Sequence, residues 1–257
     1  MSGRPHLFMI LGTPGSGRRG VLLDILENGQ MPGRNNVVLM SRKDTDIPEA
    51  RAIHASDICT LIPWSWDEDS GSIQCEALNP GAGSGDDDIF IVAEPLRSPV
   101  DQIEALKRFI DEMDFRMARI LTVVDCARVS AHQGYEYERW LDACIHFTDC
   151  VLLNHRQGVS PRWVQDFQNR YTKQHFPCLF FLVKKGKLDN PALALDPEPR
   201  RVSLAFDVVE PEFEFDPEIE EEPDMMGEED PYFVRLVSGQ REKIVPEIAP
   251  LFADQEV

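Results

Sequence analysis

The most constraining feature of the chain is a glycine-rich stretch at residues 12–19, which reads Gly-Thr-Pro-Gly-Ser-Gly-Arg-Arg. Its glycines match the pattern G-x-x-x-x-G-K-[ST], in which backbone N–H groups surround phosphate, the Lys reaches the β- and γ-phosphates, and the hydroxyl binds Mg²⁺. An apolar run at 6–11 precedes this stretch and a helical pattern at 21–26 follows it. Because a phosphate-binding loop requires that strand–loop–helix context, residues 12–19, here called the phosphate loop, predict a nucleotide-binding type of fold.

The last two positions of the phosphate loop differ from the pattern. Arg18 keeps a cation and can donate paired hydrogen bonds to phosphate, but Arg19 has no hydroxyl group with which to bind a metal. The loop therefore predicts a basic phosphate site through which Mg²⁺ is not bound. The residues predicted to form it are Gly12, Gly15, Ser16, Gly17, Arg18 and Arg19.

Strands and helices alternate along the chain after the loop. Apolar runs predict strands at 37–40, 89–93, 120–124, 151–153 and 179–183, and helical patterns begin near Pro99, Tyr135 and Pro161. The stretch 59–76 has the alternation of a hairpin, with a turn at 67–72. This order predicts an α/β fold of the P-loop NTPase type, with a mostly parallel sheet and helices on both faces, followed by an acidic C-terminal tail.

Charge divides the chain into three parts. Most of the net charge of −19 lies in residues 196–230, which contain 15 acidic residues and only two arginines. We expect a nucleotide-binding domain at 1–187, an acidic, Pro-rich linker at 188–230 with short strands at 202–206 or 213–215, and a docking segment at 231–257. Such acidity argues against nucleic acid or an anionic membrane as a partner, and leaves a protein partner for the tail as an open alternative to plain solvation.

The cysteines and histidines give no metal motif. The six cysteines form no C-x-x-C pair and lie near apolar runs, so we expect buried thiols rather than a zinc site. No secretory signal or membrane-length apolar stretch is visible, and the chain is expected to be cytoplasmic. The acidic triplet at 86–88 precedes its strand in a glycine-rich loop, and we expect it to be solvated.

Three polar residues follow predicted strands, where α/β sheets place their ligands. Glu94 has either a catalytic role, positioning water or a metal, or a structural role in its loop. Asp125 is better placed to cap the following helix than to bind a ligand. Asn154 either binds a purine base or ties neighbouring loops together.

Four motifs in this order resemble the CobW-type GTPase family, whose relatives include the UreG and HypB metallochaperones. They are the glycine spacing of the phosphate loop, Glu94 followed by Pro99 and a helix, "LTVVDC" at 121–126, and "DCVLLNHRQ" at 149–157. The resemblance spans about residues 5–185. It implies a GTPase fold, GTP or another purine nucleotide as ligand, a glutamate switch at Glu94 and a nucleoside-base strand that ends at Asn154.

The chain departs from the family at several of its functional positions. Arg18 and Arg19 replace the Lys and the Mg²⁺-binding hydroxyl, Arg97 replaces the glycine that closes the glutamate switch, and Gln157 replaces the carboxylate that recognises guanine. The zinc-binding C-x-C-C motif is missing. The family's C-terminal domain is also not recognisable, and the acidic tail follows instead. We expect guanine selectivity, γ-phosphate sensing and metal delivery to be weakened or absent.

These observations predict a divergent CobW-like protein that binds a purine nucleotide or phosphate ligand with weak or no GTP hydrolysis. Whether it is an enzyme is left open. The alternative is a nucleotide-free scaffold that binds protein partners through its acidic tail. A small-molecule kinase is a third reading, suggested only by the residues of the phosphate loop, and no lid segment for it is recognisable.

Overall fold

A computed structural model describes residues 3–29, 33–44, 53, 57–79, 86–132, 134–207 and 229–253. The strands are β1 (His6–Gly12), β2 (Asn35–Ser41), β3 (Thr60–Asp67), β4 (Ser72–Gln74), β5 (Asp87–Val92), β6 (Arg116–Asp125), β7 (Cys150–Asn154) and β8 (Leu179–Leu182). The helices are α1 (Arg18–Asn28), α3 (Pro99–Met113), α4 (Cys126–Ala131), α5 (Tyr135–His146) and α6 (Pro161–Thr172). Short 3₁₀ helices are η1 (Arg42–Asp44), η2 (Pro191–Ala194) and η3 (Ala249–Phe252).

The eight strands form one sheet in the order β4-β3-β2-β5-β1-β6-β7-β8. All neighbouring pairs are parallel except β3 and β4, which form the predicted hairpin. Strand β1 is central, with β5 on one side and β6 on the other. Since the chain runs to both sides of β1, the segment that follows this strand lies where open α/β sheets bind ligands.

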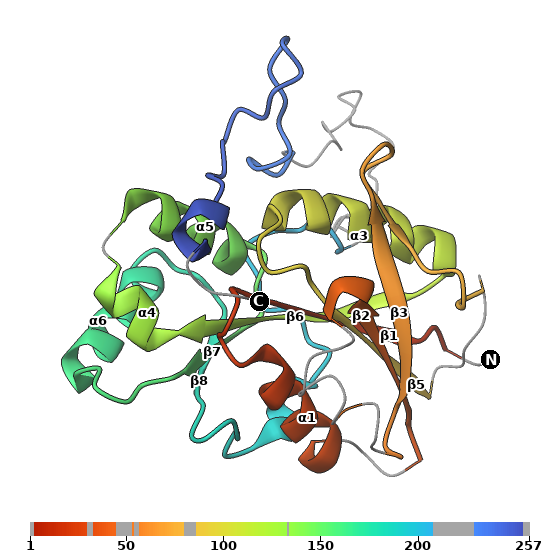
Figure 1. Ribbon diagram of the computed structural model, residues 1–257, viewed down its shortest axis with the longest axis horizontal. Helices are drawn as coiled ribbons and strands as arrows, with labels where there is room; N and C mark the ends of the chain where they lie inside the picture. Colours follow the sequence, from red (N-terminus) through yellow and green to blue (C-terminus); the bar gives the residue numbers. More distant parts are fainter. Residues whose placement is uncertain are drawn as a thin grey trace, which may run out of the picture.

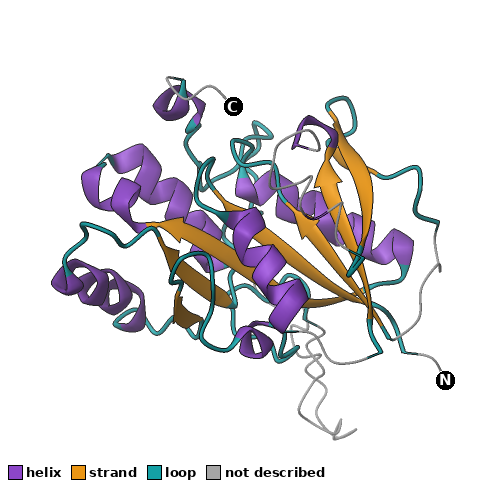
Figure 2. Cartoon of the chain, turned by 60° about the horizontal axis from the view of Figure 1, so that its bottom comes forward, coloured by secondary structure: helices purple, strands orange, loops and turns teal. Residues whose placement is uncertain are grey.

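Helices cover both faces of the sheet, as Figures 1 and 2 show. On one face α1 packs on Phe8 and Ile10 of β1, within a core that also takes in Leu121. On the other face α3, α5 and α6 pack on alternate residues of the same strands, such as Leu7 and Met9. The alternation follows from the strand period of two, and it makes β1 a fully buried strand. The predicted α/β architecture of the P-loop NTPase type is confirmed.

Three of the described helices, α3, α4 and α6, begin directly after a residue whose side chain caps them. Ser98 caps α3 and Ser160 caps α6, each with its side-chain oxygen accepting a bond from an amide in the first turn, and each is followed by a proline. Asp125 caps α4, accepting from the amide of Arg128 at 2.9 Å. The capping role expected for Asp125 is therefore confirmed.

The chain after β8 packs across the domain. Residues 188–207 include η2, which lies beside α1, and Arg201, which is buried. The strand expected at 202–206 does not form, because the segment is held by side-chain contacts and turns instead of strand pairing. The strand expected at 213–215 falls outside the described residues. From residue 229 the chain returns to α3 and α5, where Tyr232, Ile248 and Phe252 are buried.

Asp88 departs from the expected solvation of the acidic triplet. Its side chain is 4% exposed and accepts hydrogen bonds from Arg34, one of them from Nε at 2.6 Å. The expectation was wrong because β5 begins at Asp87, two residues before the apolar run, which places Asp88 inside the sheet. A buried carboxylate then requires a cationic partner, which Arg34 supplies.

Candidate functional site

The phosphate loop leaves β1 at its carboxyl end and enters α1, and two of its glycines cannot be replaced without strain. Gly12 has φ +145°, and a Cβ there would lie 2.6 Å from the carbonyl oxygen of Val123. Gly17 has φ +87°, and a Cβ there would lie 2.4 Å from Nδ2 of Asn154. Only glycine tolerates both the backbone angle and the contact, so the local fold explains the loop's glycine pattern.

The start of α1 has no side-chain cap. Its N-cap is Gly17, and α5 likewise follows a glycine, Gly134, whereas α3, α4 and α6 are each capped by a Ser or Asp side chain. The hydroxyl of Ser16 is buried and has no hydrogen-bond partner among the described residues. A buried hydroxyl without a partner is costly, and amides at a helix start attract anions. A bound anion would therefore satisfy the Ser16 hydroxyl and the first amides of α1.

Arg18 is buried and turned inward. Its Nη1 donates a short hydrogen bond to the carbonyl oxygen of Ala93, directly after β5. Burial, together with the neighbouring charge of Arg19, lowers the pKa of Arg18 to about 10, so the side chain stays cationic at neutral pH. Its Cδ would lie 3.0 Å from a Cβ at Gly12, so the side chain folds back over the loop.

Arg19 faces away from the loop toward the end of β2. Its Nη2 lies 2.8 Å from Oδ2 of Asp44, whose side chain is 8% exposed. This ion pair occupies the position where the phosphate-loop pattern has a metal-binding hydroxyl. The sequence pattern did not indicate Asp44 as the partner, because 25 positions separate the two residues.

Glu94, the residue predicted to act as a switch or catalytic acid, is held by three side chains. Its Oε1 accepts a hydrogen bond from the Ser41 hydroxyl at 3.0 Å and lies 3.3 Å from Nζ of Lys43. Its Oε2 accepts a hydrogen bond from Nε of Arg97 at 3.1 Å. With both oxygens engaged and the residue 8% exposed, Glu94 sits in a formed ionic network in this conformation.

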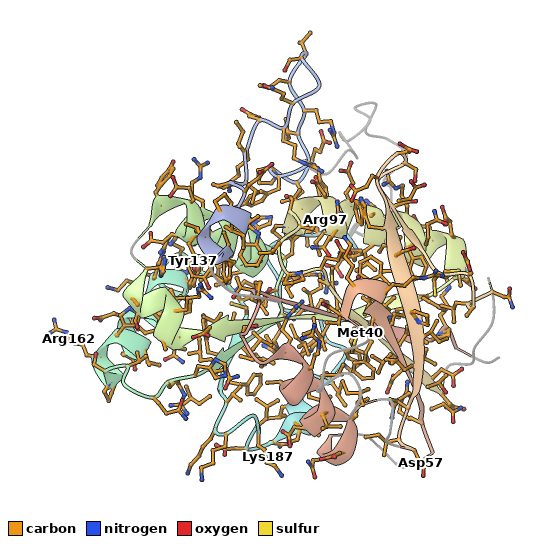
Figure 3. All side chains as sticks on the ribbon, in the orientation of Figure 1. Met40, Asp57, Arg97, Tyr137, Arg162 and Lys187 are labelled. Carbon is orange, nitrogen blue, oxygen red and sulfur yellow. The ribbon has the colours of Figure 1, made fainter. Side chains whose placement is uncertain are left out.

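Arg97 extends that network to the neighbouring hairpin. Its guanidinium also bonds to Glu68, with the shorter contact at 2.5 Å, and lies over the ring of Trp66 at 4.3 Å. Burial lowers the pKa of Arg97, but bonds to Glu68 and Glu94 outweigh it and the pKa is raised. Figure 3 labels Arg97 beside α3. Arg97 therefore links Glu94 to the hairpin formed by β3 and β4.

Asn154 ties β7 to the phosphate loop. Its Nδ2 donates to the carbonyl oxygen of Ser16 at 2.9 Å, and the residue is 4% exposed. A second tie joins the hydroxyl groups of Thr13 and Tyr137 at 3.3 Å; Tyr137 is labelled on α5 in Figure 3. Of the two roles considered for Asn154, the structure shows the one that links the loops.

A basic hollow lies beside that tie. It has a volume of about 370 Å³ and is formed by the ends of β7 and β8. Its lining residues are Asn154, His155, Arg156, Gln157, Val183, Lys184, Lys185 and Gly186. Of these residues, the sequence predicted a site role for Asn154 and indicated Gln157 as the position that affects guanine selectivity. The missed signal is that three of the seven lysines of the chain fall within residues 184–187.

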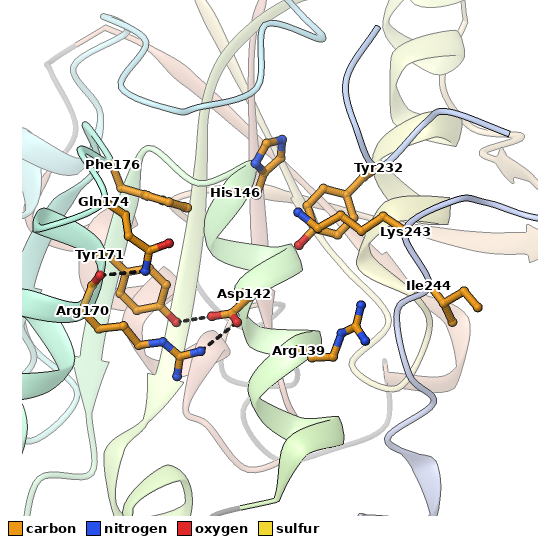
Figure 4. A pocket seen from close by; sticks show the side chains of 10 residues that line it. All are labelled: Arg139, Asp142, His146, Arg170, Tyr171, Gln174, Phe176, Tyr232, Lys243 and Ile244. Carbon is orange, nitrogen blue, oxygen red and sulfur yellow. Dashed lines mark hydrogen bonds and ion pairs between the residues drawn. The ribbon is translucent and has the colours of Figure 1, made fainter.

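Another hollow, of about 210 Å³, lies between α5, α6 and the returning C-terminal segment (Figure 4). Its central carboxylate, Asp142, accepts a bond from Tyr171 at 2.9 Å and pairs with Arg170 at 2.8 Å. Lys243 lies over the ring of Tyr232 at 4.0 Å. Its main charged groups are thus already partnered, and it includes none of the predicted site residues.

The structure was also tested for metal and membrane features. The described residues contain no group of three or more His, Cys, Asp or Glu that could hold a metal ion. All six cysteines are described, and none forms a disulfide. No helix in the described ranges combines the length and apolarity needed to cross a bilayer.

Fold and site together define an α/β protein of the P-loop NTPase type, whose predicted phosphate loop, Glu94 and Asn154 lie at one edge of the sheet. No protein-family model matches the chain, and no curated protein matches it. Among solved structures it is similar to a Zn(II)-bound YjiA GTPase from E. coli (12% identity, TM-score 0.42), over 77% of this chain and 67% of that chain. It is also similar to a Zn(II)-bound triple mutant of YjiA GTPase (12% identity, TM-score 0.44), over 80% and 69% of the two chains.

Proposed function

We propose that this protein binds the phosphate groups of a purine nucleotide in its phosphate loop and hydrolyses GTP weakly or not at all. The observation that carries the proposal is the buried Ser16 hydroxyl, which lacks a partner among the described residues beside the uncapped start of α1. In a protein that binds nothing there, these buried polar groups would each cost about 1–3 kcal/mol. Phosphate oxygens would satisfy them.

Arg18 would supply the charge for binding. It lies within the same loop, and its guanidinium stays cationic at neutral pH. Hydrogen bonds from a cation to phosphate are stronger than neutral ones, typically about 1.5–3 kcal/mol each. To reach the ligand with its Nη1, Arg18 would exchange the Ala93 carbonyl for a phosphate oxygen, which retains the number of its hydrogen bonds.

Weak hydrolysis follows from the arginines at positions 19 and 97. Phosphoryl transfer depends on a metal and cations around the γ-phosphate. Arg19 has no metal-binding atom and is paired with Asp44, while Glu94 is bonded to Arg97. A water-positioning role for Glu94 would require that pair to open. Magnesium therefore adds little to nucleotide binding in this proposal.

Base selectivity would be broad. The Nδ2 group of Asn154 is already used by the Ser16 carbonyl, and Gln157 lies exposed at the position where a carboxylate would select guanine. A carboxylate accepts two bonds from guanine, whereas a carboxamide offers one acceptor and one donor group. We therefore propose GTP, or another purine nucleotide, as the ligand. A cytoplasmic setting is part of the same proposal, supported by six thiols without a disulfide.

A specific observation also favours the alternative of a nucleotide-free scaffold. The phosphate loop is tied to β5 by Arg18, to β7 by Asn154 and to α5 by Thr13, without any ligand. Three such ties would keep the loop folded in a protein that never binds phosphate. In that case the acidic tail is the candidate surface for a protein partner.

Calorimetric titration with GTP, GDP and ATP, each with and without Mg²⁺, tests the proposal. We expect binding whose affinity is nearly independent of Mg²⁺ and is at least about tenfold weaker in Arg18→Ala. Arg162→Ala is the matched control, because Arg162 is 91% exposed on α6 and lies outside the site. Absence of binding at millimolar nucleotide would favour the scaffold.

A turnover assay separates a binding protein from an ordinary GTPase. We expect no phosphate release above the uncatalysed rate in the presence of Mg²⁺. Magnesium-dependent release that disappears in Glu94→Gln would contradict the weak-hydrolysis part of the proposal and return Glu94 to a catalytic role.

A further inference from the structure

We infer that the basic hollow at the ends of β7 and β8 is a second anion-binding site, which takes a phosphate or carboxylate group. The inference rests on the proposed function, because it extends the same ligand site beyond the phosphate loop. Its starting observation is the donor set: Arg156, Lys184 and Lys185 all line the hollow, and the lining includes no carboxylate among the described residues.

The cations of the hollow have few partners within the protein. Arg156 donates from Nη2 to the Val183 carbonyl at 3.3 Å, while its Nε is buried with no acceptor in the described part of the chain. No ion pair joins Lys184 or Lys185 to a described carboxylate. The chain has a net charge of −19, but these three cations have no acidic neighbour in the lining. The hollow is therefore a positively charged site on a negatively charged protein.

The backbone of the hollow is strained at two non-glycine residues. His155 has φ +48° and Lys185 has φ +53°. Lys184 and Lys187 exchange two backbone hydrogen bonds, at 2.8 and 3.1 Å, so Lys185 and Gly186 are the central pair of a tight turn. The first position of such a turn favours Asn, Asp or Gly, and a Lys there costs roughly 1–2 kcal/mol. A strained residue at a ligand-sized hollow indicates a functional site.

The hollow adjoins the phosphate loop. Asn154 lines the hollow and also bonds to the Ser16 carbonyl. Nε2 of His155 would lie 3.5 Å from a Cβ at Gly17. One ligand can therefore place an anionic group in each site, or two separate anions can occupy them side by side.

The Watson–Crick edge of guanine presents donors, and the side-chain acceptors that the lining offers to them include the carboxamide oxygens of Asn154 and Gln157 but no carboxylate. Arg and Lys side chains only donate, and an anion accepts from all of them at once. The volume of about 370 Å³ accommodates a phosphate group with its attached sugar or chain. The chemistry of the hollow thus favours a charged occupant.

Titration with inorganic pyrophosphate in Mg²⁺-free buffer of low ionic strength tests both sites together. The variant is Lys184→Gln with Lys185→Asn, since Asn suits the left-handed turn and keeps the fold. The matched control is Lys107→Gln with Lys173→Gln, which removes the same charge from exposed positions on α3 and after α6. We expect two pyrophosphate sites in the parent and control proteins. In the variant, the affinity of one site should fall at least about tenfold, while the other site is unchanged.

The outcomes distinguish the inference from the proposed function. If the parent protein shows a single pyrophosphate site, and Arg18→Ala abolishes it while the lysine variant leaves it unchanged, the second anion site is overturned and the phosphate loop is supported. One site that behaves in the opposite way supports the hollow and overturns the phosphate role of the loop. Absence of pyrophosphate binding overturns both.

A pair of nucleotides then identifies the source of the second anion. If one molecule bridges both sites, adenosine 3′,5′-bisphosphate binds about tenfold or more tightly than adenosine 5′-monophosphate, and the lysine variant removes that difference. If the second anion is a separate ion, the two nucleotides bind equally, and saturating adenosine 5′-monophosphate leaves a pyrophosphate site that the lysine variant still removes.

Discussion

Buried polar groups are bonded differently at the two ends of the strands, which we call the amino edge and the carboxyl edge of the sheet. At the amino end of β7, Asp149 is fully buried, and its carboxylate accepts bonds from the Ile120 amide at 2.7 Å, the Arg200 amide at 2.6 Å and Arg201 at 2.9 Å. At the carboxyl edge, the equally buried Ser16 hydroxyl has no partner among the described residues. Asp149 is thus fully bonded within the protein, although Nε of Arg200 and Nε of Arg201 beside it are also buried without a partner among the described residues, whereas the Ser16 hydroxyl has no bond at all.

The difference separates a structural charge from a candidate ligand site. A buried carboxylate with both oxygens bonded holds elements together, and here it joins β6, β7 and the segment that follows η2. An unpartnered buried donor beside a helix start stabilises nothing until an acceptor arrives. Asp149 and Ser16 are equally buried, and only their hydrogen bonds distinguish them.

The largest effect is expected at the amino edge, from Asp149→Ala. The variant leaves Arg201 buried with Asp207 as its remaining carboxylate. Breaking a buried ion pair from one side typically costs about 3–5 kcal/mol, and we expect the free energy of unfolding in urea to fall by about that amount. The control Asp166→Asn, at a surface pair, should change it by less than about 0.5 kcal/mol. If the free energy of unfolding falls by no more than it does in the control, Asp149 has no structural role and the contrast between the two edges does not hold.

An intermediate effect is expected at the carboxyl edge, from Asn154→Ala. Losing its buried bond to Ser16 should lower the free energy of unfolding by about 1–2 kcal/mol. Because the bond shapes the loop, pyrophosphate and GTP should weaken by the same factor, measured by calorimetry against the exposed control Gln165→Ala. A variant that binds pyrophosphate normally but GTP poorly would instead make Asn154 a base-binding residue.

The smallest effect concerns Asp230, near the amino edge, which accepts a bond from His146 at 2.8 Å. Burial raises the pKa of this carboxyl, but bonds from His146 and Ser203 outweigh it, so the pKa lies below its ordinary value of 3.8. The stabilisation is therefore present above pH 3.8 and is lost as the pH falls through the lowered pKa.

Asp230→Asn should accordingly be less stable than the parent by about 1 kcal/mol at pH 7, because the amide can still accept a hydrogen bond from His146 but lacks the charge of the carboxylate. The difference should shrink at pH 3, as measured by urea unfolding at both pH values. Glu198→Gln, at an exposed position, serves as the control and should show no such trend. A difference that is constant with pH would exclude the carboxylate as its cause.

The sequence predicted the scaffold because its signals are local. The apolar runs, the prolines after Ser98 and Ser160, and the hairpin turn each lie within a few residues of the element that they specify. The positions of the loop glycines were equally readable, since the angles at Gly12 and Gly17 exclude other residues. Asp125 was assigned correctly for the same reason.

The partners of the site residues could not be predicted, because they come from distant segments. Arg18 meets Ala93 across 75 positions, and Asn154 meets Ser16 across 138. Asp88 was misplaced because its partner Arg34 lies 54 positions away. Residue identity showed which groups are charged, but only the folded sheet shows which charges are already paired.

The bond between Arg18 and Ala93 has a consequence for measured affinity. A molecule in which Arg18 is held by that carbonyl is not yet competent to bind through the same Nη1, so only the fraction with the bond open binds at full strength. The apparent dissociation constant equals the intrinsic one divided by that fraction. A protein with this loop would therefore bind its ligand with a larger apparent dissociation constant than one in which Arg18 is already free, although the contacts in the bound state would be the same.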